Sequence, residues 1–117
     1  MSWGVVGVGL AGRARARAIL ADERCDLVGV VRGRFAGEFD VPSYRFDDLV
    51  AKVDAVAICS PNALHADQVQ VALEHNCHVL VEFPLALRSD EAAQLFQQAE
   101  SKKRLLHVEH IELLLAW

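Results

Sequence analysis

Short runs rich in valine and isoleucine recur along this chain, and segments with helical spacing separate them. The runs are Val5–Val8, Leu27–Val31, Ala55–Cys59, Val79–Val81 and Leu105–Val108. Near-continuous apolar character is typical of strands covered on both faces in a parallel sheet. The helices expected between them are Gly12–Ala21, Phe46–Ala51, Ala63–Glu74 and Ser89–Ser101, the last with Ser89 as its N-cap. The alternation predicts an α/β fold, a doubly wound parallel sheet with right-handed crossovers.

Size and charge exclude several classes of protein. The chain has 117 residues, of which 53% are hydrophobic, so residues 1–117 are expected to form one domain. Its net charge of −4 offers no basic surface to nucleic acid or to an anionic membrane. No apolar run reaches the ~18–20 residues that span a bilayer, and the N-terminus lacks the basic region of a signal peptide. Three cysteines without CxxC spacing indicate reduced thiols, and we expect a cytoplasmic protein.

A glycine-rich loop follows the first expected strand and opens the first expected helix. It consists of Gly7, Val8, Gly9, Leu10, Ala11 and Gly12, a GxGxxG pattern. In such loops the first glycine allows a tight turn, the second lets the backbone approach a pyrophosphate, and the third lets the helix pack on the strand. The context predicts a Rossmann-type dinucleotide site; the alternative is a packing turn in a fold that binds no nucleotide.

The end of the second expected strand bears on the choice of dinucleotide. A carboxylate at this place accepts hydrogen bonds from the ribose 2′-hydroxyl of NAD. The sequence instead has Arg32 and Arg34, whose guanidinium groups suit a 2′-phosphate. We therefore expect NADP(H), with the alternative that both arginines are solvated loop charges.

Further candidates lie where later strands end, because ligands of open α/β sheets bind at the carboxyl edge. Ser60, Pro61 and Asn62 follow the third strand and are expected to line the nicotinamide ribose side or to form a helix-capping turn. His65, just inside the next helix, either faces the ligand or lies on the helix surface. Glu82 is expected at the cofactor edge, where its hydrogen bonds could fix the turn.

Three stretches, "GVVGVGLAG", "VDAVAICSPNALHADQVQVALEHNCHVLVEFPLAL" and "LLHVEHIELL", make the chain similar to the N-terminal domain of the glucose-fructose oxidoreductase/inositol dehydrogenase (Gfo/Idh/MocA) family. In that family the turn after the corresponding strand usually reads Glu-Lys-Pro, and the resemblance implies proton transfer by the lysine. Here that position is Phe83, which cannot exchange a proton. A role in oxidising a polyol or sugar is therefore disfavoured.

The biliverdin reductase branch of this family is the better match, and the cyanobacterial type above all. The Glu-aromatic-Pro turn and the pattern H-x-E-H-x-E-L-L beginning at His107 carry this resemblance. It implies NADPH-dependent reduction of the central methine bridge of biliverdin, and a second antiparallel-sheet domain that this chain lacks. The alternatives are another dehydrogenase of the family, acting on a different small molecule, or a regulatory NADP(H)-binding module without catalysis.

The end of the chain combines acidic and imidazole side chains with an apolar run. Glu109 and His110 are expected to face the cofactor or substrate cleft, or to form hydrogen bonds at a domain junction. A metal site is not expected, because the motif is not HExxH and the change from strand to helix separates the side chains. Residues 109–117 predict the first turns of an interdomain helix without a cap, which is either cut short or available for self-association.

Overall fold

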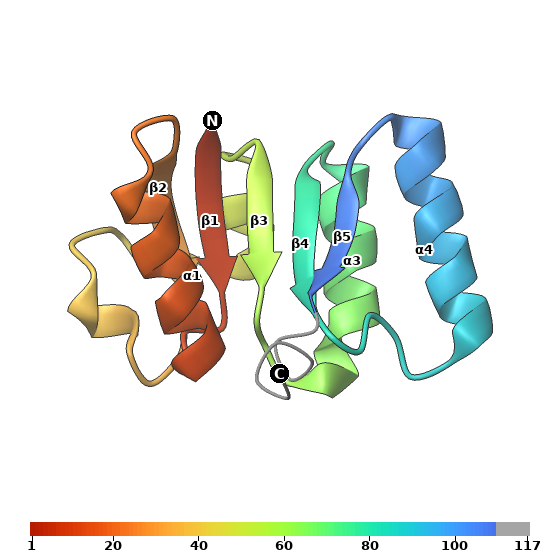
Figure 1. Ribbon diagram of the computed structural model, residues 1–117, viewed down its shortest axis with the longest axis horizontal. Coiled ribbons are helices and arrows are strands. Elements are labelled where there is room, and N and C mark those ends of the chain that lie inside the picture. Colours follow the sequence, from red (N-terminus) through yellow and green to blue (C-terminus); the bar gives the residue numbers. More distant parts are fainter. Residues whose placement is uncertain (110–117) are drawn as a thin grey trace, which may run out of the picture.

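The computed structural model describes residues 1–109, which form a parallel sheet flanked by helices (Figure 1). In chain order the elements are β1 (Ser2–Val6), α1 (Leu10–Ala21), β2 (Asp26–Val31), the 3-10 turn η1 (Ala36–Glu38), α2 (Phe46–Val50), β3 (Ala55–Ile58), the 3-10 turn η2 (Asn62–Leu64), α3 (His65–Glu74), β4 (His78–Glu82), α4 (Ser89–Lys102) and β5 (Leu106–Glu109). The predicted α/β class and the order of strands and helices are confirmed.

The five strands lie in the order β2-β1-β3-β4-β5, and every pair is parallel. Ser43 makes an isolated parallel bridge to Val30 on the outer side of β2. Counted as a rudimentary strand, this bridge completes the arrangement of the doubly wound dinucleotide-binding sheet. The chain reverses its winding between β1 and β3, so the ligand crevice is expected where these two strands end.

Two apolar layers hold the helices on opposite faces of the sheet. On one face α2, α3 and α4 pack through a cluster that includes Leu49, Ile58 and Leu73, all fully buried. On the other face α1 packs through a smaller cluster around Ala16 and Val30. Each fully buried large aliphatic side chain contributes about 1.5–3 kcal/mol. The two layers therefore keep the carboxyl ends of the strands in one rigid edge.

Most element boundaries differ from the sequence prediction by one to three residues, and β1 and α4 show why. β1 begins earlier than expected, because Ser2 and Trp3 already pair with β2, and it ends at Val6 because Gly7 turns the chain with φ +83°. The N-cap of α4 is Arg88 rather than Ser89, and no side-chain hydrogen bond caps this helix. An offset of one residue at a helix end is common where no cap residue fixes the boundary.

Within residues 1–109 no helix combines the length and the apolar character needed to cross a lipid bilayer. Glu109, the first residue of the predicted C-terminal helix, ends β5 instead. Residues 110–117, the rest of that predicted helix, lie outside the described part of the chain, and so does its proposed self-association.

Candidate cofactor site

The glycine loop has the geometry that a dinucleotide site requires. A Cβ atom on Gly7 would lie 2.7 Å from the Cα of Ser60, and one on Gly12 would lie 2.1 Å from the carbonyl oxygen of Gly7. These two positions admit no side chain, because the loop, β3 and α1 pack directly on one another. A Cβ atom on Gly9 would have no neighbouring atom within 4 Å. The space beside Gly9 is therefore open to a phosphate group.

Neighbouring backbone holds the glycine loop in place. The N–H groups of Gly7 and Val8 donate to the carbonyl oxygens of Val31 and Arg32 at 2.8 Å each, and Phe35 N–H donates to the carbonyl of Val8 at 2.8 Å. Val8 is fully buried, so it shapes the loop and offers no surface to a ligand. The N–H groups of the first turn of α1 have no partner within the helix, and no acidic residue lies there. This helix end suits a pyrophosphate.

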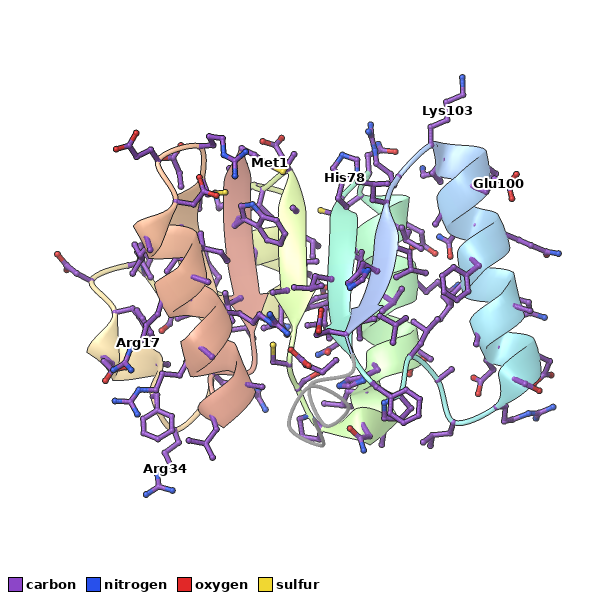
Figure 2. All side chains as sticks on the ribbon, in the orientation of Figure 1. Met1, Arg17, Arg34, His78, Glu100 and Lys103 are labelled. Atoms are coloured by element: carbon purple, nitrogen blue, oxygen red, sulfur yellow. The ribbon has the colours of Figure 1, made fainter. Side chains whose placement is uncertain are left out.

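A cavity of about 1110 Å³ opens at the carboxyl ends of β1, β2 and β3. Its lining residues are Val6, Gly7, Gly9, Val31, Arg32, Gly33, Arg34, Ser43, Tyr44, Arg45, Phe46, Asp47, Cys59, Ser60, Pro61, Leu64 and Gln68. Figure 2 shows Arg34 extending into solvent beyond this edge of the sheet. A cavity of this size, with an open helix N-terminus and basic side chains, fits a phosphorylated dinucleotide.

The cavity includes some predicted cofactor residues and omits others. Gly7, Gly9, Arg32, Arg34, Ser60 and Pro61 line it. Val8, Leu10, Ala11, Gly12, Asn62, His65 and Glu82 do not. Leu10 is 77% exposed, and with Ala11 and Gly12 it forms the first turn of α1, where only backbone N–H groups are suited to a phosphate. Asn62 begins η2 and is exposed.

His65 is neither on the helix surface nor in the cavity, in contrast to both sequence interpretations. It is 1% exposed. Its Nε2 lies 2.6 Å from the carbonyl oxygen of Ser60, and its Nδ1 lies 2.7 Å from the carbonyl oxygen of Pro84. A carbonyl oxygen only accepts, so both contacts are hydrogen bonds only when both ring nitrogens carry protons. His65 thus joins the turn after β3 to the turn after β4.

Several cavity residues could not be found from the sequence patterns. Arg45, Ser43 and Tyr44 come from the loop before α2, which shows no strand or helix periodicity. Gln68 lies one turn into α3 and accepts a hydrogen bond from the Ser60 hydroxyl. The bridge between Ser43 and Val30 is what brings the loop to the cavity, and a single bridge has no sequence signature.

The ends of β4 and β5 carry a compact charge cluster. Arg15, from α1, donates from Nε to Oε1 of Glu82 at 2.9 Å, and its second nitrogen lies 3.9 Å from Oε2 of Glu109. Glu82 and Glu109 are register neighbours on the two strands. Nε2 of His107 lies 3.1 Å from Oε2 of Glu109. The carboxylate of Glu82 is therefore an ion-pair partner that ties α1 to the sheet, and its predicted fixing of the turn after β4 stays a prediction.

Cys59 lies between this cluster and the cavity. Its Sγ is 3.8 Å from Oε1 of Glu82. Burial, reinforced by the negative charge of Glu82, raises the pKa of this thiol to about 12. Burial likewise raises the pKa of Cys77 to about 11. Both thiols stay protonated at neutral pH and are poor nucleophiles.

Phe83 stands at the turn that follows β4, with 55% of its surface exposed. Its N–H donates to the carbonyl oxygen of Glu109 at 2.9 Å, which extends the pairing of β4 and β5 beyond the strands. The ring is thereby held at the carboxyl edge of the sheet, the edge where the cavity opens. His110, the other predicted cleft residue, lies outside the described residues.

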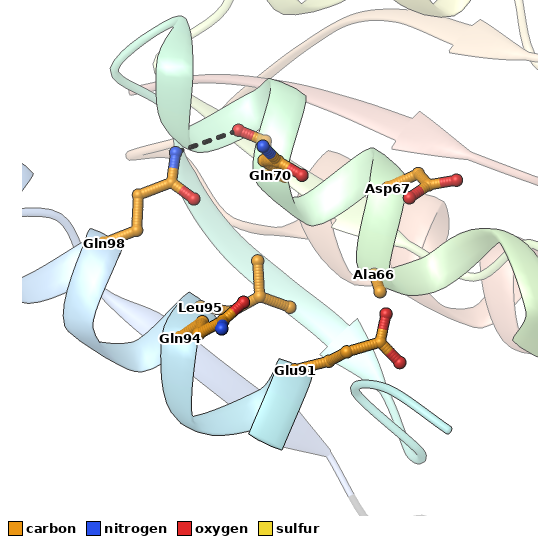
Figure 3. Close-up of a pocket in the computed structure, with 7 residues that line it drawn as sticks. All are labelled: Ala66, Asp67, Gln70, Glu91, Gln94, Leu95 and Gln98. Atoms are coloured by element: carbon orange, nitrogen blue, oxygen red, sulfur yellow. Dashed lines mark hydrogen bonds between the residues drawn. The ribbon is translucent and has the colours of Figure 1, made fainter. Parts of the chain in front are cut away.

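A second hollow, of about 160 Å³, lies between α3 and α4 (Figure 3). It is lined by Ala66, Asp67, Gln70, Glu91, Gln94, Leu95 and Gln98, and Gln98 donates across it to the carbonyl of Gln70 at 3.2 Å. Its charged residues are acidic, so it does not suit a phosphate. In residues 1–109 no group of three or more His, Cys, Asp or Glu side chains is placed to hold a metal ion.

Comparison with known proteins agrees with this geometry. Residues 1–110 match the Gfo/Idh/MocA model, described as an oxidoreductase family with an NAD-binding Rossmann fold. The chain belongs to this family. It is an NAD(P)-binding oxidoreductase domain, and the predicted fold family is confirmed.

Individual relatives include two kinds of enzyme. The chain is 38% identical to biliverdin reductase A of Mus musculus over 117 residues, 95% of this chain and 40% of that protein. It is 32% identical to UDP-N-acetylglucosamine 3-dehydrogenase of Acidithiobacillus ferrooxidans over 121 residues, 96% of this chain and 37% of that protein. A structure of biliverdin reductase from Synechocystis in complex with biliverdin and NADP+ matches with a TM-score of 0.90 and 37% identity, covering 97% of this chain and 39% of that one. The chain thus spans about 40% of the length of these relatives.

Proposed function

We propose that residues 1–117 are the NADPH-binding part of a biliverdin-reductase-like oxidoreductase. When bound, NADPH supplies a hydride that, with a proton, reduces the central methine bridge of biliverdin and gives bilirubin. The residues of this chain bind and orient the nucleotide. The glycine loop and the start of α1 hold the pyrophosphate, and the arginines that follow β2 hold the 2′-phosphate.

Phe83 is the observation that carries the choice of substrate. Oxidation of a sugar or polyol hydroxyl needs a group that takes the proton, and a phenyl ring cannot do so. Glu82, the adjacent carboxylate, is already paired with Arg15 at 2.9 Å. An exposed aromatic ring at the carboxyl edge instead offers a flat apolar surface, which suits a planar conjugated tetrapyrrole.

The comparisons support the same choice. Two mammalian biliverdin reductases, from mouse and human, are 38% and 36% identical to the chain. The structure with biliverdin and NADP+ resembles the chain along 97% of its length. Relatives that oxidise sugars also match, at 32% identity for the UDP-N-acetylglucosamine enzyme, so the substrate must be tested directly.

A spectroscopic assay distinguishes the two classes of substrate. The protein is mixed with NADPH and biliverdin, and the biliverdin band is followed as the bilirubin band grows. In parallel, NADP+ is supplied with glucose, inositol or UDP-N-acetylglucosamine, and formation of NADPH is followed. We expect biliverdin to bind to the NADPH-loaded protein, with no oxidation of the sugars; reduction to bilirubin would show in addition that residues 1–117 suffice for the reaction. Sugar oxidation without any binding or reduction of biliverdin would overturn the proposal.

A further inference from the structure

Arg45 belongs to the same cavity wall as the two arginines after β2, although it is distant from them in sequence. The backbone explains how it arrives there. Val30 N–H donates to the carbonyl of Pro42 at 3.1 Å, and Tyr44 N–H donates to the carbonyl of Val30 at 2.8 Å. These two bonds form the parallel bridge between Val30 and Ser43. Parallel chains advance together, so Arg32 and Arg45, two residues beyond the bridge on each chain, reach the same level of the sheet edge.

Gly29 makes this approach possible. A Cβ atom at this position would lie 2.4 Å from Cε2 of Tyr44 and 3.0 Å from the carbonyl oxygen of Pro42. Without a side chain at Gly29, the ring of Tyr44 lies directly on β2. The loop is thereby anchored one residue before Arg45.

The charges around this wall are not neutralised within the protein. Arg13, Arg15, Arg17, Arg24 and Arg88 each pair with a carboxylate. In the described part of the chain Arg32 and Arg45 have no ion pair, and Arg34 has only a contact with the ring of Phe35, at 5.3 Å. Asp47 is the acidic residue among those that line the cavity. Three guanidinium groups against one carboxylate leave this wall positive.

We infer that Arg45 is a third ligand of the adenosine 2′-phosphate, beside Arg32 and Arg34, and that it helps to set the preference for NADPH over NADH. The inference rests on the proposed binding of NADPH. A phosphate dianion accepts several charge-assisted hydrogen bonds, and the planar guanidinium group suits two of its oxygens at once. NADH has only a hydroxyl at this place, so loss of Arg45 should affect NADPH selectively.

The test compares the affinities of the folded protein for NADPH and NADH, and for 2′,5′-ADP and 5′-AMP as smaller probes. Arg45→Gln should weaken binding of NADPH and 2′,5′-ADP by about tenfold or more, the usual worth of a charge-assisted hydrogen bond. Binding of NADH and 5′-AMP should change by less than about twofold, because they lack the phosphate. Arg45→Lys should weaken binding less than Arg45→Gln, since lysine keeps the positive charge but cannot donate to two phosphate oxygens in the planar geometry of a guanidinium group.

Two controls separate this effect from general loss of positive charge. Lys102→Gln removes a cation at the end of α4, and Arg88→Gln removes one before α4; neither residue lines the cavity. Both should leave the ratio of NADPH to NADH affinity unchanged. An equal loss for both nucleotides on Arg45→Gln, or no loss, would overturn the role of Arg45. Failure of the unsubstituted protein to bind either nucleotide would instead refute the proposed function.

Discussion

The arginines at the two ends of the carboxyl edge of the sheet differ in whether they form ion pairs. At the β1–β2 end, Arg32 and Arg45 line an open cavity and have no ion pair within residues 1–109. At the β4–β5 end, Arg15 lies 2.9 Å from Glu82 and 3.9 Å from Glu109, so its charge is paired within the protein, although its Nη2 atom is buried without a hydrogen-bond partner in the described residues. The first end is arranged to receive an anion. The second end is held together by ion pairs of Arg15, and the aromatic side chain of Phe83 lies at the same edge.

Substitutions in the glycine loop test the first end most severely. Gly12→Ala places a methyl group 2.1 Å from the carbonyl oxygen of Gly7, and such overpacking should lower the free energy of unfolding by about 3 kcal/mol. Gly9→Ala adds the same methyl group in open space, so it should cost about 1 kcal/mol or less while weakening nucleotide binding. Urea unfolding and NADPH titration measure both effects. Equal destabilisation by the two variants would contradict the assignment of Gly9 to the ligand and Gly12 to packing.

His65 joins the turn after β3 to the turn after β4, so its removal should affect both turns. His65→Ala deletes the contacts with the carbonyl oxygens of Ser60 and Pro84 and empties the space of a buried ring, which together should cost about 2–3 kcal/mol. Since Ser60 lines the cavity, NADPH affinity should fall as well. His75→Ala, at an exposed position after α3, should change stability by less than about 0.5 kcal/mol. Comparable thermal stability of the two variants would refute the connecting role.

Arg15→Gln tests whether the β4–β5 end depends on its internal ion pairs. Glu82 and Glu109 would then face each other without a counter-charge, and the free energy of unfolding should fall by about 1–2 kcal/mol for these partly buried groups. Arg17→Gln breaks an exposed pair with Glu38 and should cost less than about 0.5 kcal/mol. Chemical denaturation at neutral pH measures both losses, and equal losses for the two substitutions would contradict the dependence of the β4–β5 end on Arg15.

The smallest effect concerns the thiols. With pKa values raised to about 12 for Cys59 and about 11 for Cys77, both should react slowly with iodoacetamide at mildly alkaline pH. The raised pKa also favours the folded state while unfolded thiols remain protonated, below about pH 9. This contribution should decline as the pH rises from there toward 11–12, because the unfolded thiols ionise first. Mass spectrometry of the labelled protein checks the reactivity, and rapid labelling of native Cys59 would contradict its burial.

The sequence was sufficient for features that depend on local pattern. Apolar runs located the strands of the sheet, and the GxGxxG loop predicted the turn at Gly7 and a helix directly after it, although α1 begins at Leu10 and not at Gly12. Features that depend on contacts between distant segments could not be predicted from the sequence. Arg45 reaches the cavity only because Tyr44 lies on Gly29, and His65 is buried only because the turn at Pro84 folds over it. The spacing of apolar residues along the chain does not indicate which distant segments come into contact.

The charge cluster of Arg15, Glu82 and Glu109 is another contact between distant segments that the sequence pattern could not predict. Arg15 resembles an ordinary solvated residue in the Ala/Arg-rich first helix, and only the fold reveals that it faces Glu82 and Glu109. The position of Glu82 at the end of a strand predicted that it lies at the cofactor edge, yet its partner could not be read from spacing. Roles for Glu82, Phe83, Glu109 and His110 in the reaction stay predictions.

The most direct test of nucleotide binding at the β1–β2 end is an NMR titration of the ¹⁵N-labelled protein with NADP+ and with NAD+. We expect amide shifts at Gly9, Gly33 and Arg45, larger for NADP+ than for NAD+, and no shifts at Gln70 and Gln98 in the hollow between α3 and α4. Shifts confined to that hollow would contradict binding of the nucleotide at the β1–β2 end. Identical shifts around Arg45 with both nucleotides would contradict the role of Arg45 as a ligand of the 2′-phosphate.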